Sequence, residues 1–479
     1  MSTTVVRSPT SRVRLGHARV DITPPVGIYH RLWGAARHDR ASGVHRPLYA
    51  DVLALAPRGP GEMPVVRALL DLAGLVQVQH QRMVAALADG AGVASERVVL
   101  TYSHTHSSGW FVPDRMPFPG GELIEPYIET LASRLRGAAR EGVAALEDAT
   151  ITYGTGRSDM GANRDYTDDA HGLRACGFNP DAPCDDTVVV ARATAEDGRL
   201  LLTLVNYACH PTTLAWENTL ISPDYPGALR ETVEHTTGAP CVFAQGMCGD
   251  IGPRRGFSGA TQLADRNGEQ AGYAALSALS GMSPAGADLT YAGPVVSGAT
   301  LGTWHDTPHD AGRAEQTERF AGCTFTVELP LKPRPDREQL RRELAEWEGR
   351  QRQFSEAENA GAARDAGAHA ERARRWLARL EDLPPGDAYP LTCSAYRLGD
   401  AVWVACGGEP YSALQIELRR RCPDLTVIAS PLMGDLQVAY LLTEEAYGTG
   451  RYQEEPSILA PGCLERLTDA IAARIDALS

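Results

Sequence analysis

The feature that most constrains the fold is an alternation between short apolar runs with strand spacing and longer segments with helical spacing. This alternation predicts an α/β fold, because strands and helices follow one another instead of being segregated into separate parts of the chain. Two runs are continuously apolar, as in strands buried on both faces. The expected strands lie at 14–23, 52–55, 65–70, 98–102, 187–192, 200–208, 240–244, 395–398, 401–405 and 426–429, and the expected helices at 76–88, 122–146, 263–279 and 464–478.

The chain reads as one domain over residues 14–479 with a helical insertion at about 333–383. No linker rich in Gly, Ser or Pro divides it, and no repeat of 20 to 50 residues occurs. The stretch 335–383 is rich in Arg, Glu and Ala and poor in β-branched residues, which predicts one long helix or a helical hairpin with a turn near 361–367. Its charge density favours an exposed surface insertion.

Composition excludes two classes of function. The 46 Lys and Arg against 60 Asp and Glu give a net charge of -14, which argues against nucleic acid and against anionic membrane surfaces as partners. Residues 1–16 hold no apolar run of signal-peptide length, so we expect a cytoplasmic protein without stable membrane association. The ten Cys form no CxxC pair, which favours free thiols over disulfides or a thiolate metal site.

Polar residues that follow apolar strands are the first candidates for a site, because ligands of open α/β sheets bind beyond the carboxyl ends of strands. His104 and His106 directly follow one such run, His210 follows a second, and Glu409 and Tyr440 lie just past two later ones. Together they offer N and O donors that suit zinc with an open position for water. Each residue alone is more often incidental, so this pattern leaves a purely structural role open.

Several short motifs with these residues occur in one order along the chain. They are Ser103-His104-Thr105-His106-Ser107, Asn179-Pro180-Asp181-Ala182-Pro183-Cys184-Asp185-Asp186, Asn206-Tyr207-Ala208-Cys209-His210-Pro211-Thr212, Ser222-Pro223-Asp224-Tyr225-Pro226-Gly227, Gln245-Gly246-Met247-Cys248-Gly249-Asp250-Ile251, Gly408-Glu409-Pro410 and Tyr440-Leu441-Leu442-Thr443-Glu444-Glu445-Ala446-Tyr447, followed by Tyr452 and Glu454. This series resembles the motifs of the neutral ceramidases from about Gly16 to Pro461, with the helical insertion unmatched. The resemblance implies an α/β domain with a mixed β-sheet core and flanking helices.

The resemblance also implies a site. The zinc ligands of that family fall on His104, His210, Glu409 and Tyr440, and its proton-transfer residue on His106. A zinc ion at these ligands would activate water for attack on an amide carbonyl. His106 would then take the proton of the water and return it to the leaving nitrogen.

Two further active-site residues are implied by the same resemblance. Arg164, in Gly161-Ala162-Asn163-Arg164, matches the active-site Arg of the family, and Tyr452 matches its second active-site Tyr. With zinc and Tyr440, these groups would hold the tetrahedral oxyanion.

The chain departs from the family in three ways. Gly252 stands where the family has a Ser, which excludes that Ser as a nucleophile and favours a metal-activated water. A secretion signal and the C-terminal immunoglobulin-like domain of secreted ceramidases are also missing from the sequence given, so we do not expect ceramide itself as the substrate.

The loop after the His pair bears on substrate choice. Trp110 and Phe111 could line an apolar pocket, or the loop could equally pack onto the domain. With Gly252 they are the candidate substrate contacts.

The function expected from the sequence is zinc-dependent hydrolysis of a linear amide, with a small-molecule N-acyl compound as partner. Two alternatives stay open at this point. The same site could serve acyl transfer or an intramolecular ring closure in a biosynthetic pathway, since a Lewis acid that polarises a carbonyl also serves attack by an amine. A catalytically silent binding protein is motivated by Gly252 but disfavoured by the complete His, Glu and Tyr set. The sequence names neither the substrate nor the oligomeric state.

Overall fold

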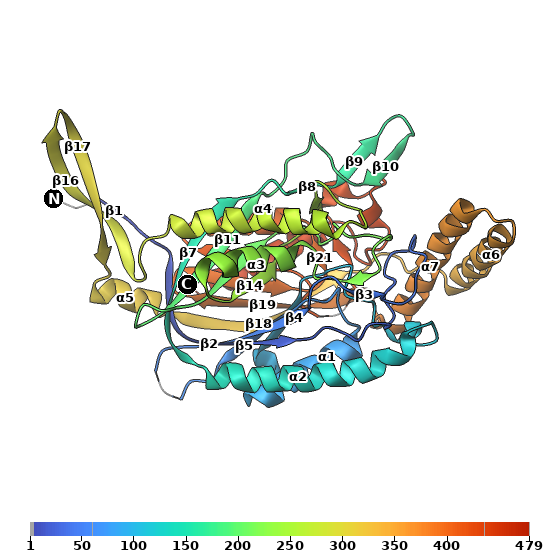
Figure 1. Ribbon diagram of the computed structural model, residues 1–479, viewed down its shortest axis with the longest axis horizontal. Helices are drawn as coiled ribbons and strands as arrows, with labels where there is room; N and C mark the ends of the chain where they lie inside the picture. Colours follow the sequence, from blue (N-terminus) through green and yellow to red (C-terminus); the bar gives the residue numbers. More distant parts are fainter. Residues whose placement is uncertain (1–3, 60, 435, 479) are drawn as a thin grey trace.

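The computed structural model describes residues 4–59, 61–434 and 436–478, and its centre is a mixed sheet of eight strands (Figure 1). The strand order is β14-β12-β11-β7-β2-β4-β5-β6, antiparallel throughout except for the parallel pairs β5 with β6 and β12 with β14. The predicted α/β fold with a mixed sheet and flanking helices is confirmed. The strands are β2 (Thr10–Asp21), β4 (Tyr49–Ala56), β5 (Val65–Leu70), β6 (Val98–Tyr102), β7 (Glu147–Arg157), β11 (Thr187–Ala195), β12 (Leu200–Tyr207) and β14 (Cys241–Gln245).

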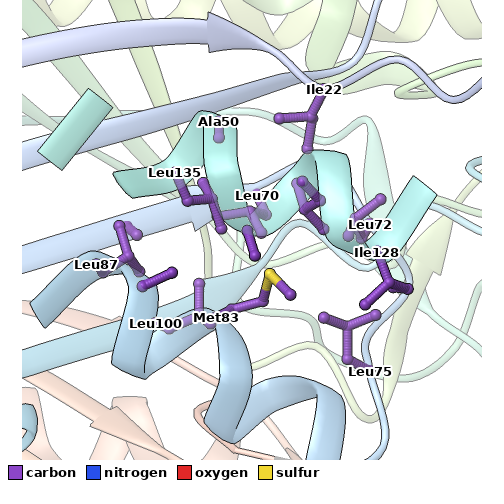
Figure 2. Packing of buried hydrophobic residues seen from close by; sticks show 14 of the residues in the cluster. Ile22, Ala50, Leu70, Leu72, Leu75, Met83, Leu87, Leu100, Ile128 and Leu135 are labelled. Carbon is purple, nitrogen blue, oxygen red and sulfur yellow. The ribbon is translucent and has the colours of Figure 1, made fainter. Parts of the chain in front are cut away.

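Four helices cover one face of this sheet. They are α1 (Gln77–Ala91), α2 (Ile124–Ala144), α3 (Tyr225–Thr237) and α4 (Thr261–Ser280). Strand β4 shows how side chains are divided between the two faces, since Val52 belongs to the core under α1 and α2 whereas Leu53 and Leu55 belong to the core on the opposite face. Figure 2 shows the first of these cores, where Met83 and Leu87 of α1 lie among aliphatic side chains of the sheet and of α2.

A second sheet of four strands packs on the other face. Its order is β18-β19-β20-β22, formed by Phe320–Pro330, Ala388–Leu398, Ala401–Cys406 and Thr426–Ser430. Trp403 and Ile428 share a core with Leu53 and Leu55 of the first sheet. The far face of the second sheet packs against α8 (Ala413–Arg421) and α9 (Cys463–Asp476). The body therefore has four layers in the order helix, sheet, sheet, helix.

Four small strand pairs lie in the connections, and two of them build the site. They are β3 (Gly43–Val44) with β13 (Leu220–Ile221), β8 (Gly161–Asn163) with β15 (Ile251–Pro253), β9 (Asp165–Asp168) with β10 (Leu173–Cys176), and β21 (Glu409–Pro410) with β23 (Tyr440–Leu441). No helix in the described part of the chain combines the length and hydrophobicity needed to cross a membrane.

Two extensions leave the body at opposite ends (Figure 1). One is a hairpin of β16 (Ala287–Ser297) and β17 (Ala299–Pro308), joined by β1 (Val5–Val6) and followed by α5 (Ala311–Thr317). The sequence patterns did not predict this hairpin. The other is a helical pair, which we call the helical arm, formed by α6 (Arg337–Glu356) and α7 (Ala360–Asp382).

The turn of the helical arm lies earlier than the sequence suggested. The chain reverses at 357–359, where Glu358 has a positive φ of 54° and the Asn359 side chain accepts a hydrogen bond from the Ala362 N–H. Asn359 therefore caps the start of α7. The predicted turn near 361–367 is wrong, since Gly361 and Gly367 lie inside α7.

Candidate metal centre

Strand ends of the central sheet deliver two histidines to one place. His104 follows β6 with a φ of 67°, a left-handed conformation that is uncommon for a residue with a Cβ and often marks a functional site. Its N–H donates to the Leu72 carbonyl at 2.9 Å. His210 lies three residues beyond β12, and its N–H donates to the Ile251 carbonyl at 3.0 Å. Backbone hydrogen bonds thus fix the direction of both imidazoles.

The small strand pair β21–β23, which follows the second sheet, contributes a carboxylate and a phenol. Glu409 and Tyr440 are direct partners in the parallel pair β21–β23, and the Glu409 N–H donates to the Ala439 carbonyl at 2.6 Å. Both side chains are buried. The sheet register therefore sets Glu409 beside Tyr440 at the carboxyl side of β20.

The ligand atoms of His104, His210 and Glu409 converge. Glu409 Oε2 lies 3.4 Å from Nε2 of His104 and 3.0 Å from Nε2 of His210. The other ring nitrogens are engaged, since Nδ1 of His104 is 2.6 Å from the Ala73 carbonyl oxygen and Nδ1 of His210 is 2.8 Å from that of Cys248. A carbonyl only accepts, so each Nδ1 carries the proton and each Nε2 presents a lone pair.

This arrangement fits a bound cation. His210 Nε2 and Glu409 Oε2 are buried and make no hydrogen bond with any described residue. Two facing lone pairs at 3.0 Å in a buried site repel each other unless a proton or a cation lies between them. A neutral imidazole and a carboxylate with an engaged second shell are typical zinc ligands.

His106 completes a group of three histidines whose ligand nitrogens lie within 4.8 Å of one another. Its ring centre is 4.8 Å from that of His104 and 5.6 Å from that of His210. Neither ring nitrogen of His106 has a hydrogen-bond partner among the described residues. Because His106 lacks the carbonyl partner that both other histidines have, the geometry separates it from them.

Burial and neighbouring charges set the ionisation of the site in the absence of a metal. Burial and then the Arg164 charge lower the pKa of His210 to about 4. Burial, His104 and His210 lower the pKa of His106 well below its ordinary value. Burial opposes ionisation of Glu409, but His104 and His210 hold its pKa well below the usual range. These shifts favour neutral His106 and His210 beside an ionised Glu409.

Arg164 lies behind Tyr440. Its guanidinium donates to the Gly249 carbonyl at 2.7 and 3.2 Å and lies 5.3 Å from the centre of the Tyr440 ring. The Tyr440 ring lies 6.1 Å from that of His210. Tyr452, in the 3-10 helix Tyr452–Glu454, makes an edge contact with Tyr440 at 5.9 Å and is half exposed.

Gly252 sits in β15 opposite Ala162 of β8. A Cβ at this position would meet Arg164 Cδ at 3.5 Å, which is ordinary van der Waals contact. No steric demand requires glycine there.

A cavity of about 550 Å³ opens onto these residues. Its lining includes His104, His106, Glu409, Tyr440 and Tyr452. Helix α7 of the helical arm contributes a further part of the lining, through Ala368, Glu371, Arg372, Arg375, Trp376, Ala378, Arg379 and Asp382. The arm was expected to be an exposed surface insertion, yet residues of α7 line the cavity.

The two aromatic residues of the loop after the histidines are placed differently. Trp110 is half-buried and lines the cavity. Phe111 is 2% exposed, belongs to the core under α2 and packs on Tyr127 at 4.8 Å. Its side chain is not part of the cavity lining, so we assign it no contact with a substrate.

Sequence reasoning missed the residues that reach the site from distant segments. Trp33 lies 5.1 Å from the His106 ring and also contacts Trp216 and Phe257. Arg375 and Arg379 come from the helical arm. No local motif marks these positions.

No family model matches the sequence, and no curated protein matches it. The solved structures that match its fold include neutral ceramidase from Pseudomonas aeruginosa and a ceramidase complexed with C2. Each has a TM-score of 0.66 and 16% sequence identity, over 98% of this chain and 75% of the other. The expected likeness to ceramidases is thereby confirmed at the level of structure, and the chain has the neutral-ceramidase fold with three clustered histidines that form a candidate metal centre.

Proposed function

We propose that the chain is a zinc-dependent hydrolase of linear amide bonds. The observation that carries this proposal is a facing pair of buried atoms, His210 Nε2 and Glu409 Oε2, that have no hydrogen-bond partner among the described residues. Glu409 and the neighbouring His104 also line the cavity. The solved structures of the same fold are named as ceramidases, and ceramide is an amide, which supports the reaction class.

His104, His210, Glu409 and Tyr440 are the proposed ligands. Nitrogen and oxygen donors with no cysteine suit a catalytic zinc with one position open. Zinc bound there would supply Lewis acidity and lower the pKa of water toward neutrality. Burial of these side chains keeps bulk water from competing for the donors.

The remaining residues divide the other tasks. Neither ring nitrogen of His106 has a hydrogen-bond partner among the described residues, so His106 can accept a proton from the attacking water and deliver it to the leaving nitrogen. Tyr452 lines the cavity beside Tyr440 and can donate to a developing oxyanion. The Arg164 guanidinium donates to the Gly249 carbonyl and lies over the Tyr440 ring, so we assign Arg164 the role of positioning Tyr440.

Metal content and turnover test this proposal on one preparation. Protein purified without chelator should hold about one zinc per chain, and chelation should abolish release of amine from a panel of N-acyl amines. Readdition of zinc should restore the rate. Protein that carries no transition metal, and takes none up on dialysis against zinc, would falsify the proposal.

A further inference from the structure

Helix α7 brings two arginines, Arg375 and Arg379, into the cavity lining, and the proposed catalytic steps use neither of them. Arg375 and Arg379 are one helical turn apart, so both project from the same face of α7, and both line the cavity. Their like charges repel, and the charge of Arg375 therefore lowers the pKa of Arg379. A bound anion would relieve this repulsion.

Arg379 is the uncompensated member of this pair. Its guanidinium donates to the Pro456 carbonyl at 2.7 Å and lies 5.2 Å from the centre of the Trp376 ring. It has no carboxylate within ion-pair distance among the residues that the structure describes. Burial, which Glu455 offsets only in part, lowers the pKa of Arg379 below its ordinary value.

The nearby carboxylates of the described residues have other partners. Glu371 accepts from Arg115 at 2.6 and 3.1 Å, and also from Arg374 and Arg375. Glu455 accepts from the indole N–H of Trp376 at 2.9 Å and pairs with Arg372 at 3.5 Å.

Asp382, on the same helix, accepts a hydrogen bond from Gln437 at 3.2 Å. Arg379 lines the cavity, and its guanidinium uses one N–H group on the Pro456 carbonyl and lies beside the Trp376 ring, so other N–H donors remain for a ligand.

We propose that Arg379, with Arg375 beside it, binds a carboxylate carried by the amide substrate. The inference rests on the proposed function and adds to it the class of substrate, an amide with a free carboxylate at one end. A singly charged carboxylate fits better than a doubly charged phosphate, because Glu371, Glu455 and Asp382 line the same cavity and would repel a second negative charge. The apolar lining of Trp110 and Trp376 leaves room for an aliphatic segment between the two ends.

The test compares probes that differ by one charge. The first pair is N-octanoylglycine and N-octanoylglycinamide, with the charge on the amine side. The second pair is N-octylglutaramic acid and N-octylglutaramide, with the charge on the acyl side. The proteins are wild type, Arg379→Gln, Arg379→Lys and, as a control on the same helix, Arg364→Gln, whose exposed side chain pairs with Asp365.

Wild type should favour the carboxylate member of one pair in kcat/KM by about 10- to 100-fold, the effect of one charged hydrogen-bonded pair. Arg379→Gln should abolish that preference, because the rate on the carboxylate member falls by more than the rate on the neutral member. Arg379→Lys should retain part of the preference, and Arg364→Gln all of it. Thermal unfolding of each variant separates these effects from loss of folded protein.

Other outcomes overturn the inference. Equal rates of wild type on both members of each pair, or an equal fall of both rates in Arg379→Gln, would mean that Arg379 does not read charge. If no probe is turned over, calorimetric titration of the same probes decides, since a Kd difference that depends on Arg379 upholds carboxylate binding even where zinc analysis refutes the hydrolase. Equal Kd values in wild type and Arg379→Gln refute carboxylate binding by Arg379.

Discussion

At the scale of single side chains, the three histidines differ in what holds the second ring nitrogen. Nδ1 of His210 is fixed by the Cys248 carbonyl, whereas both nitrogens of His106 are without partners among the described residues. An imidazole held by a second-shell carbonyl is arranged as a ligand, and one that is not can turn to move protons. This difference divides the roles within one cluster.

We therefore expect His210→Ala and His106→Ala to fail in different ways. His210→Ala should lose zinc and all activity, because one of the few ligands is gone. His106→Ala should keep about one zinc per chain and lose about 10²- to 10⁴-fold in kcat, the usual contribution of general acid/base catalysis. Zinc content, thermal unfolding and turnover measured on the same samples distinguish these results. Metal-free His106→Ala protein would make His106 a ligand instead.

Gly252 gives a second prediction at this scale. A serine side chain fits, because its Cβ would only touch Arg164 at 3.5 Å, although the site is buried and the hydroxyl needs a partner. We expect Gly252→Ser to lower the free energy of unfolding by about 1 kcal/mol and to leave kcat no higher than that of wild type. Denaturant unfolding and amide turnover measure both quantities. Activity that appears only in the serine variant would show that the chain is a disabled relative of a serine-dependent enzyme.

The sequence indicated the candidate metal centre more clearly than the rest of the cavity. His104, His210 and Glu409 closely follow apolar runs, which made them candidates, and the resemblance to ceramidases then selected them. The structure brings these three residues together. Trp33 contacts the His106 ring and Arg379 lines the cavity, although the local patterns of their segments are those of a loop and of an exposed helix. Tertiary contacts alone give these two residues a role.

At the scale of elements, a buried ion pair anchors the helical arm to the body. Arg115 is 1% exposed, and its guanidinium donates to both carboxylate oxygens of Glu371 on α7. Burial opposes ionisation of Glu371, but Arg375 and Arg115 lower its pKa to about 2. Helix α7 is amphipathic, but its buried face is largely alanine with charged residues beside it. The sequence therefore shows no strongly apolar stripe.

This anchor predicts a pH dependence. The pKa of Glu371 is below its ordinary value of 4.5, so its contribution to stability is complete above pH 4.5 and is lost as the pH falls toward about 2. Glu371→Gln should cost about 3 kcal/mol at neutral pH, because Arg115 is left buried without its partner, and should lack this acid dependence. Glu338 on α6 is exposed and pairs with Arg341, so Glu338→Gln is the control. We expect it to change the free energy of unfolding by less than about 1 kcal/mol.

Denaturant unfolding between pH 7 and pH 2.5, with limited proteolysis of the 357–359 turn, measures both effects. Equal stability of wild type and Glu371→Gln at neutral pH would mean that the arm is held by its apolar contacts alone.

At the scale of the whole molecule, the site lies where two sheets meet. His104 and His210 extend from the first sheet, and Glu409 and Tyr440 follow the second. The Asn206 side chain of β12 donates to the Ala429 carbonyl of β22 at 2.9 Å, close to these strand ends. The strands were predictable from alternation and apolar runs. Their division between two stacked sheets was not, because the pairings join segments far apart in the chain and leave no local signal.

Trp403 tests whether the contact between the sheets holds the fold together. Its side chain is 2% exposed between them, its indole N–H donates to the Tyr153 hydroxyl at 3.3 Å, and the Arg67 guanidinium lies 5.1 Å from its ring centre. Trp403→Ala removes a large side chain from a packed interior and should lower the free energy of unfolding by about 3 to 5 kcal/mol. The same substitution at Trp304, on the projecting β17, should cost less than about 1 kcal/mol, because that ring is half exposed and packs mainly on Tyr291.

Denaturant unfolding followed by fluorescence and by circular dichroism should give one transition in each variant, since both sheets share this core. Two separate transitions in Trp403→Ala, or a loss no larger than that of Trp304→Ala, would mean that each sheet is stabilised by its own helices and that the metal centre joins two independently stable halves.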